Sequence, residues 1–331
     1  MGASLLEQPE PFQHALISWF AKVAQDYPWR RTTDPYEILV SEVMLQQTTV
    51  QSVIENRRFE RFLEEFPTVH ELAVASEEQI LRAWEGLGYY NRVRNLQKTA
   101  KAVIDEYEGE FPSDLQLLQQ LPGVGAYTSA AVASFAFGLS APLVDANVSR
   151  VFARVFDDET PINTPAGQKL AWSRAEVLVP ADQARSYNAG LMELGQQVCK
   201  NKEVLCDQCP VQSYCQTTRP LELPKKKAKA KSEEVTEHAL WLRRGERVLL
   251  QQGQGSRRKG MWTLPLIPTD VGLPLVSQTK YAITKYKVTL RVYSGDEIPA
   301  EGRWVSLSEL EQLPIPSPIR KVIESLLQQF I

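Results

Sequence analysis

A short glycine-containing segment between two apolar stretches constrains the fold of this 331-residue chain more than any other feature. The segment is Leu-Pro-Gly-Val-Gly, residues 121–125. Apolar spacing predicts a short helix before it over 114–120 and an alanine-rich helix after it over 127–138. Gly123 and Gly125 allow a tight turn that leaves backbone N–H groups uncovered at a helix N-terminus, where a phosphate is favoured. An ordinary turn between two helices explains the same residues. Other stretches of the sequence must therefore distinguish a phosphate-binding turn from an ordinary one.

Residues 1 to about 218 are predicted to form an all-α domain. Apolar residues recur there at spacings of three and four, and strand-like alternation is absent. The expected helices are residues 8–26, a helix starting at Asp34 and Pro35, 54–65, 76–86, 90–108, 114–120, 127–138, 148–156, 166–178 and 186–196. An apolar content of 43% is sufficient for a buried helical core.

The composition changes after this domain. Residues 219–232 contain two prolines and five lysines, which is typical of a solvated linker. Beyond it the apolar period shifts toward two, and over 286–293 apolar and polar residues alternate as in a half-buried strand. A last helix is predicted from about Ser317. Its apolar stripe comprises Ile319, Val322, Ile323, Leu326, Leu327 and Phe330. Residues 233–331 are therefore predicted to form a separate α+β domain.

The charge distribution restricts the possible partners. A net charge of −3 and a pI near 5.8 by themselves disfavour a nucleic-acid partner. However, residues 219–259 carry a local charge of +7, which leaves −10 on the remainder. A DNA contact is therefore expected along local basic stripes, with an affinity that falls as salt rises. No apolar run approaches the ~18 residues of a membrane span, and the first residues lack a signal-peptide pattern. We expect a cytoplasmic protein without a membrane partner.

All four cysteines lie within one window of 17 residues. They are Cys199, Cys206, Cys209 and Cys215, with the spacing C-x6-C-x2-C-x5-C. Such clustering in a cytoplasmic chain argues against disulfides and is typical of a metal centre with four thiolate ligands. Zinc sites more often use two C-x2-C pairs, whereas this window has one. The residues alone leave both zinc and an iron–sulfur cluster open.

Two acidic residues, Glu42 and Asp145, occupy positions that suggest a chemical role. Glu42 shares a predicted helix face with Ile38, Leu39 and Leu45, where desolvation would raise its pKa and make it a proton donor. The alternative is a glutamate at the edge of the apolar stripe that reaches water. Asp145 precedes a predicted helix start, where it can act as the N-cap. An aspartate held in this way can also stabilise a cationic transition state.

Several of these stretches, in this order, resemble the MutY-type adenine DNA glycosylases, which belong to the helix-hairpin-helix, iron–sulfur, endonuclease III superfamily. The matching stretches are Ser-Glu-Val-Met-Leu-Gln-Gln-Thr at 41–48, Gly-Leu-Gly-Tyr-Tyr at 86–90, the segment at 121–125, Val-Asp-Ala-Asn-Val at 144–148, and the cysteines. The resemblance covers residues 10–218. It implies that 113–138 is a helix-hairpin-helix that holds DNA through Gly123, Val124 and Gly125. It also implies that the loop 199–215 binds one [4Fe–4S] cluster rather than zinc.

The resemblance further implies a reaction and the residues that perform it. Adenine is flipped out of the duplex, Glu42 protonates its ring as the glycosidic bond breaks, and Asp145 stabilises the oxocarbenium-like sugar. Tyr127 and Asn147 support these carboxylates, and Leu45, Gln47 and Tyr89 enter the base stack. Bifunctional relatives carry a lysine where this chain has Tyr127, and a tyrosine forms no Schiff base. A monofunctional glycosylase is therefore predicted.

The second domain resembles the Nudix-type domain of the same family through residues 249–252 and 260–265. The acidic magnesium-binding helix of Nudix hydrolases is absent, so this domain is not expected to have the Nudix hydrolase activity. In the family this domain recognises 8-oxoguanine through a Phe-Ser-His loop. Here the corresponding stretch is Ile283–Thr284–Lys285, in which Thr284 replaces the serine hydroxyl. Selectivity for 8-oxoguanine over guanine is therefore predicted to be weaker than is usual in the family.

The predicted protein is a monomeric, nucleoid-associated enzyme of base excision repair. Its predicted partner is double-stranded DNA with adenine opposite 8-oxoguanine or guanine. One alternative is a mismatch thymine or uracil DNA glycosylase on the same scaffold. Another is a non-catalytic DNA-binding iron–sulfur protein, which would have no need of the paired Glu42 and Asp145.

Overall fold

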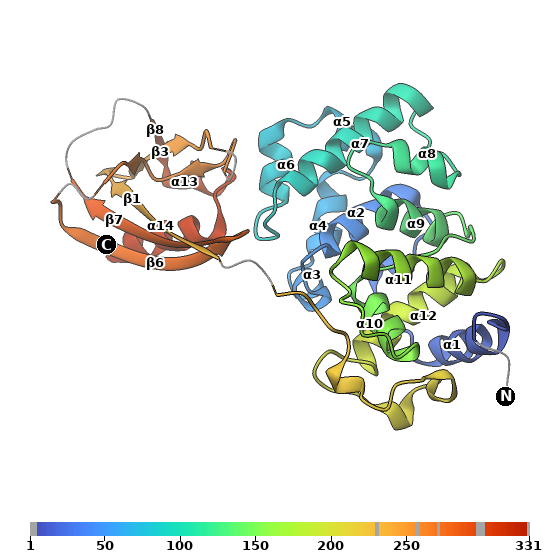
Figure 1. Cartoon of the computed structure of the whole chain (residues 1–331). Helices are drawn as coiled ribbons and strands as arrows, with labels where there is room; N and C mark the ends of the chain where they lie inside the picture. Colours follow the sequence, from blue (N-terminus) through green and yellow to red (C-terminus); the bar gives the residue numbers. More distant parts are fainter. Residues whose placement is uncertain (1–4, 229–231, 256–257, 270–271, 296–301, 330–331) are drawn as a thin grey trace. The chain divides into compact units, whose positions relative to one another are not determined.

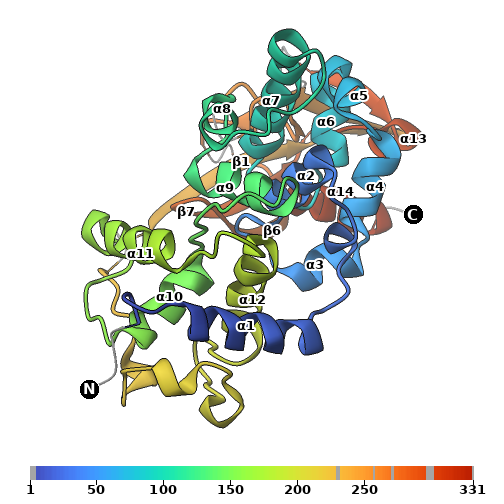
Figure 2. The same cartoon turned by 90° about the vertical axis from the view of Figure 1, so that its right-hand side faces the viewer.

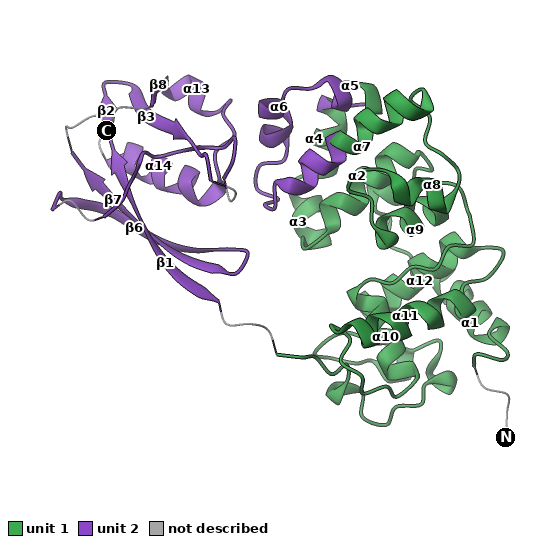
Figure 3. Ribbon diagram, turned by 45° about the horizontal axis from the view of Figure 1, so that its top comes forward, with its two compact units in different colours: residues 1–64, 68–70, 98–228 green, residues 65–67, 71–97, 229–331 purple. Residues whose placement is uncertain are grey.

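A computed structural model describes residues 5–228, 232–255, 258–269, 272–295 and 302–329. The chain divides into two compact units (Figure 3). The first comprises residues 1–64, 68–70 and 98–228, and the second comprises residues 65–67, 71–97 and 229–331. The second unit thus combines the C-terminal region with a helical segment from the first third of the chain.

The first unit is helical (Figure 1). Its helices are α1 (Glu10–Val23), α2 (Pro35–Leu45), α3 (Val50–Glu55), α4 (Arg58–Glu65), α8 (Leu115–Gln120), α9 (Ala126–Phe135), α10 (Ala146–Val155), α11 (Pro165–Leu178) and α12 (Ala184–Gln197). Helix α12 packs against both α1 and α10 (Figure 2). The core between these three helices includes Phe12, Leu16, Phe152 and Leu191, each at most 1% exposed.

Several predicted helix bounds need correction. The predicted helix 54–65 is two helices, α3 and α4, because Arg57 adopts a left-handed φ of 48° between them. Helix α9 ends at Phe135 rather than at residue 138, where Gly138 has a φ of 68°. Local backbone reversals of this kind override the apolar period, which continues through both breaks.

Helices and strands combine in the second unit. Helix α6 (Glu77–Ala83) lies within it. Helices α5 (Val69–Val74) and α7 (Asn91–Tyr107) cross the division between the units, as α4 does at its last residue, Glu65. One sheet has the order β5-β1-β7-β6, formed by β1 (Glu233–Trp241), β5 (Leu266–Ile267), β6 (Leu275–Ile283) and β7 (Tyr286–Ser294). Strands β1 and β7 are parallel, and the other pairs are antiparallel. The sequence pattern did not predict α5.

A second sheet is centred on β3 (Arg247–Gln252). Its other strands are β2 (Arg243–Arg244), β4 (Trp262–Thr263) and β8 (Arg303–Ser306), each antiparallel to β3. Helices α13 (Leu307–Leu310) and α14 (Ser317–Gln329) complete the unit. The predicted alternation in β7 and the stripe of α14 both form buried core. This core includes Val288, Leu290, Val292, Ile319, Val322, Ile323 and Leu326. Leu327 is partly buried, and Phe330 lies outside the described residues.

The C-terminal region is therefore α+β, and the first unit carries the helical fold. No helix within the described ranges combines the length and apolar character that a bilayer span requires.

Candidate active site

Helix α2 carries Glu42 into the interior of the first unit. Asp34 caps this helix by accepting hydrogen bonds from the backbone N–H groups of Tyr36 at 2.7 Å and Glu37 at 3.4 Å, and Pro35 occupies its first turn. Glu42 is only 4% exposed. The glutamate is thus buried, which removes the alternative that it reaches water from the edge of the apolar stripe.

Tyr127 is the direct partner of this buried carboxylate. It lies in the first turn of α9, and its hydroxyl donates a 2.6 Å hydrogen bond to Glu42 Oε2. Burial raises the pKa of Glu42 to about 7, the hydrogen bond from Tyr127 opposes the shift, and the charge of Asp145 adds to it. Glu42 can therefore hold a proton near neutral pH. Burial raises the pKa of Tyr127 well above its ordinary value, so its hydroxyl stays protonated as the donor.

Asp145 is the N-cap of α10. Its Oδ1 accepts a 2.6 Å hydrogen bond from the Val148 backbone N–H, and its Oδ2 accepts a 2.9 Å hydrogen bond from the Asn147 side chain. Burial raises the pKa of Asp145, whereas these hydrogen bonds and the charge of Arg150 lower it. The structure thus brings Glu42, Tyr127, Asp145 and Asn147 together, since Asp145 is close enough to affect the pKa of both Glu42 and Tyr127.

Two residues that the sequence pattern did not indicate hold this arrangement. Arg150 donates to Asn147 Oδ1 at 2.9 Å, to the Gly195 carbonyl at 2.7 Å and to the Cys199 carbonyl at 2.9 Å. Gly195 of α12 lies so close to α10 that a Cβ would approach the Cβ of Asn147 to 2.6 Å. Arg150 therefore connects the Asp145 cap with the first cysteine. The spacing of Arg150 one turn after Asn147 is the only feature of the sequence that could have indicated this link.

A cavity of about 340 Å³ opens beside Glu42. Leu45 and Trp29 also line it, together with Arg30, whose guanidinium pairs at 2.5 Å with the fully buried Glu193. Trp29, Arg30 and Glu193 were not predicted as site residues. The break in the helical pattern at 27–31 could have indicated Trp29 and Arg30, since it combines aromatic rings with two arginines.

The glycine-containing turn has the predicted local form. Gly123 has a φ of 81°, and Gly125 is the N-cap residue of α9, where an added Cβ would meet no heavy atom within 4 Å. Val124 is 8% exposed and anchors the turn to the core. The cap of α8 is Asp114, whose carboxylate accepts from the backbone of Gln116 and Leu117. The start of α9 therefore presents backbone N–H groups without a side-chain cap.

The other predicted DNA contacts occupy exposed turns. Gln47 follows α2 with a φ of 58°. Tyr89 belongs to the second unit, is 47% exposed and has a φ of 48°. The guanidinium of Arg92 lies 5.7 Å from its ring centre. Thr284 is at the tip of the β6–β7 hairpin with a φ of 52°, and its hydroxyl donates to the Ile283 carbonyl at 2.7 Å. Next to it, Lys285 pairs with Glu233 at 2.6 Å.

The four cysteines are free thiols that line one cavity of about 420 Å³. Arg154 also lines it and donates to Cys199 Sγ at 3.2 Å, while its Nη2 atom is buried without a hydrogen-bond partner among the described residues. Within the described ranges, no three His, Cys, Asp or Glu side chains are placed to hold a single metal ion. A donor set of four sulfurs beside an unpaired guanidinium N–H suits an anionic group larger than one ion.

Comparison with known proteins agrees with this geometry. Residues 40–173, which contain Glu42, Tyr127 and Asp145, match the family model of the HhH-GPD superfamily of base excision DNA repair proteins. A solved thermostable thymine-DNA glycosylase superposes with a TM-score of 0.58 at 31% identity, covering 65% of this chain and 97% of that protein. Endonuclease III in a non-covalent DNA complex superposes with a TM-score of 0.52 at 26% identity. The match covers 63% of this chain and 95% of the endonuclease III chain.

These likenesses define the class as a helical base-excision repair protein, and closer relatives define the family. The adenine DNA glycosylase of Mycolicibacterium smegmatis is 40% identical over 201 residues, which are 60% of this chain and 67% of that protein. Human adenine DNA glycosylase is 42% identical over 221 residues, 64% of this chain and 40% of the human protein. The chain belongs to the HhH-GPD superfamily, within the family of the adenine DNA glycosylases. It spans less than half the length of its mammalian relatives.

Proposed function

We propose that this chain is a monofunctional DNA glycosylase that hydrolyses the N-glycosidic bond of adenine mispaired with 8-oxoguanine or guanine. The observation that carries the proposal is the buried Glu42 carboxyl group, which faces the 340 Å³ cavity and is held by the Tyr127 hydroxyl at 2.6 Å. A pKa near 7 lets Glu42 both give and take a proton at neutral pH.

The proposed reaction assigns complementary roles to the two carboxylates. Glu42 donates its proton to a ring nitrogen of adenine as the C1′–N bond breaks and its electron pair moves to the base. Asp145, as a carboxylate, stabilises the positive charge that develops on the sugar. Water then adds to C1′ and returns a proton to Glu42. The products are adenine and an abasic site, and strand cleavage is not part of the cycle, because Tyr127 supplies no amine for a Schiff base.

DNA binding is proposed to use several surfaces. The uncapped N–H groups of the 123–125 turn would hold a backbone phosphate at the start of α9. Leu45, Gln47 and Tyr89 would occupy the space left by the flipped base. Thr284 would contact the base opposite adenine, and the lack of an aromatic ring at Ile283 and of an imidazole at Lys285 supports weak discrimination between 8-oxoguanine and guanine.

We also propose that the four cysteines hold one [4Fe–4S] cluster. A zinc ion would bring four sulfurs within about 4 Å of one another, since Zn–S bonds are about 2.3 Å long. Here the sulfurs surround a cavity of about 420 Å³, and Arg154 supplies the nearby positive charge. When bound, the cluster would fix the loop that follows α12. Iron and sulfide analysis with a visible absorption spectrum tests this, and stoichiometric zinc without iron would contradict it.

The test of the function is a single-turnover assay with excess protein and end-labelled duplexes. The duplexes carry adenine opposite 8-oxoguanine, adenine opposite guanine, and thymine or uracil opposite guanine. Each reaction is analysed with and without hot alkali. Breaks at adenine that appear mainly after alkali are the expected result, with similar rates for the first two duplexes. A large preference for 8-oxoguanine would contradict the proposed role of the Thr284 stretch.

A second candidate function is mismatch thymine or uracil glycosylase. The likeness to a thymine-DNA glycosylase over 97% of that protein favours it. Breaks at thymine or uracil, with none at adenine, would select this candidate. Tight duplex binding without any break would instead indicate a non-catalytic DNA-binding protein.

A further inference from the structure

The chain that follows the cysteines stays packed on the first unit as far as its first lysines. The composition of residues 219–232 predicts a solvated linker, yet Leu223 is only 3% exposed. Its carbonyl accepts a 3.0 Å hydrogen bond from Nε of Arg154, a 1% exposed residue in the last turn of α10. The start of the predicted linker is therefore part of the first unit, because a buried side chain and a buried hydrogen bond hold it there.

Three hydrogen bonds fix the backbone of the next residues, 225–227, which we call the lysine segment. The Ile162 N–H donates to the Lys225 carbonyl at 3.1 Å. The Asn163 side chain bonds Lys227 twice: its Nδ2 donates to the Lys227 carbonyl at 2.9 Å, and its Oδ1 accepts from the Lys227 N–H at 2.8 Å. The lysine segment is thus held against the loop between α10 and α11 (Figure 1).

The ammonium groups of the lysine segment have little acidic compensation. Lys226 and Lys227 are exposed, and within the described residues neither forms an ion pair. Lys225 lies 4.0 Å from Glu222, a carboxylate that also pairs with Arg219 at 3.3 Å. Adjacent positive charges repel one another. The segment therefore concentrates positive charge at a fixed place on the surface of the first unit.

Fixing like charges in this way has a cost in the unbound protein, both from their repulsion and from the lost freedom of the backbone. A partner that neutralises several charges at once offsets the repulsion, and its binding requires no further ordering of the backbone. The lysine segment therefore suits a partner with closely spaced negative charges. Duplex DNA is such a partner, since it carries one negative charge per ~1.7 Å of its axis.

The position of the segment relative to the candidate active site also favours DNA. Asp145 caps the start of α10, and Arg154 lies nine positions further along the chain, about 13 Å along the helix axis. With about 3.4 Å between successive phosphates of one strand, this distance corresponds to about four base pairs. A duplex with one nucleotide at Asp145 therefore has phosphates at the distance of the lysine segment.

We propose that the lysine segment, anchored by Asn163, is a DNA-backbone contact that binds phosphates about four base pairs from the nucleotide at Asp145. This contact rests on the proposed function only in that its partner is duplex DNA, and it does not depend on excision. It is independent of base sequence, because lysine ammonium groups meet phosphates as point charges.

The test is equilibrium binding of the full-length protein to a short, fully paired duplex, measured by fluorescence anisotropy between about 50 and 200 mM salt. The variant K226A/K227A removes two ammonium groups and keeps the backbone hydrogen bonds. Its slope of log affinity against log salt should become less steep by about 1.8, and its affinity at the lowest salt should fall about tenfold. The matched control K22A/K321A removes two exposed lysines of α1 and α14 and should keep the wild-type slope.

The variant N163A tests the anchor without a change of charge. It should keep the wild-type salt slope and bind about threefold more weakly, because the segment must then be ordered on binding. Thermal unfolding checks that each variant is folded. Reduced slope in K226A/K227A alone supports the contact even if no adenine is excised, a result that would contradict only the proposed glycosylase.

Three results would overturn the proposal. The first is a wild-type salt slope in K226A/K227A, and the second is an equal reduction of the slope in the control K22A/K321A. The third is wild-type DNA affinity in N163A, which would remove the anchoring role of Asn163. Binding of polyglutamate that is lost in K226A/K227A while the DNA slope is unchanged would assign the segment to an acidic protein partner instead.

Discussion

The candidate active site places two carboxyl groups in different surroundings, Glu42 on α2 and Asp145 at the start of α10. At α2, Glu42 is 4% exposed, and its hydrogen bond to Tyr127 does not offset the desolvation of the carboxylate. At the start of α10, Asp145 accepts hydrogen bonds from Val148 and Asn147 and lies near the charge of Arg150. Burial raises both pKa values, but Asp145 has several donors that stabilise its charged form and Glu42 has one.

This difference shows how one site can hold a protonated carboxyl group and an ionised carboxylate side by side. The charge of Asp145 itself raises the pKa of Glu42, so the ionised aspartate favours the protonated glutamate. Two carboxyl groups placed in unlike surroundings therefore divide the roles of proton donor and charge stabiliser. Substitutions at these two positions should weaken the proposed excision in predictable ways.

The largest effect is expected for E42Q. Glutamine keeps the shape and can accept the Tyr127 hydrogen bond, but it cannot donate the proton, so single-turnover excision should fall by about 10²–10⁴-fold. Binding to the mispaired duplex should stay within a few-fold of the wild type. E37Q on the same helix is the matched control and should retain activity. Excision by E42Q at the wild-type rate would remove Glu42 as the acid.

The next largest effect is expected for D145N. Asparagine is as good an N-cap as aspartate, so the folding stability should change little, while loss of the negative charge should slow excision by about 10²–10³-fold. D145A should lose both the charge and the cap. Thermal unfolding beside the single-turnover rate separates the two contributions. A wild-type excision rate in D145N, with rate and stability lost only in D145A, would mean that Asp145 acts as a cap and not through its charge.

A smaller effect is expected for Y127F. The Tyr127 hydrogen bond lowers the pKa of Glu42, so its removal should raise that pKa further above 7. The fall of the excision rate with increasing pH should therefore move to higher pH, by about one unit or less for one hydrogen bond. A shift to lower pH would contradict the assigned direction of this interaction.

The last effect concerns stability rather than rate. Because the pKa of Glu42 rises from 4.5 to about 7 on folding, the folded protein keeps a proton that the unfolded chain loses between these pH values. The free energy of unfolding should fall across this window by about 3 kcal/mol relative to E42Q, which lacks the group. Denaturant unfolding at pH 4.5 and pH 8 measures it. A stability difference independent of pH would show that Glu42 is ionised in the folded state.

The helical half of the molecule was well predicted from sequence where the pattern is local. Spacing placed Glu42 on an apolar face but left open whether it reached water, because helical periodicity does not say what packs against the edge of a stripe. The answer depends on Tyr127, which lies 85 positions away in the sequence. The break at Arg57 was missed because a single left-handed residue leaves no trace in an apolar pattern.

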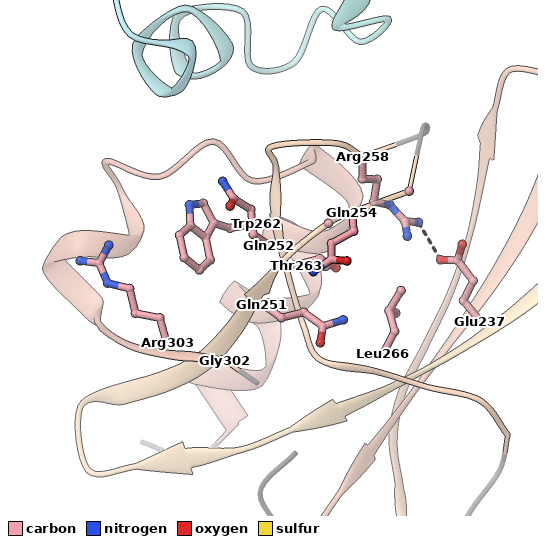
Figure 4. A pocket seen from close by; sticks show the side chains of 12 residues that line it. Glu237, Gln251, Gln252, Gln254, Arg258, Trp262, Thr263, Leu266, Gly302 and Arg303 are labelled. Carbon is pink, nitrogen blue, oxygen red and sulfur yellow. Dashed lines mark hydrogen bonds and ion pairs between the residues drawn. The ribbon is translucent and has the colours of Figure 1, made fainter. Parts of the chain in front are cut away.

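The residue pattern alone predicted no contact between distant segments; only the family resemblance placed Tyr127 beside the carboxylates. The link from Asn147 through Arg150 to Cys199 requires α10 and α12 to approach closely at Gly195, which spacing within one helix cannot reveal. A cavity of the C-terminal region likewise arises where strands of two sheets meet (Figure 4). Thr284 was chosen by resemblance, and its position at an exposed hairpin tip leaves its role a prediction.

The most direct test is the pH dependence of single-turnover adenine excision by the wild-type protein on a duplex with adenine opposite 8-oxoguanine. If buried Glu42 supplies the proton, the rate should fall as the pH rises through about 7, and E42Q should lack this dependence. A wild-type rate that stays constant or increases from pH 6 to pH 8.5 would contradict the assignment of Glu42 as the acid.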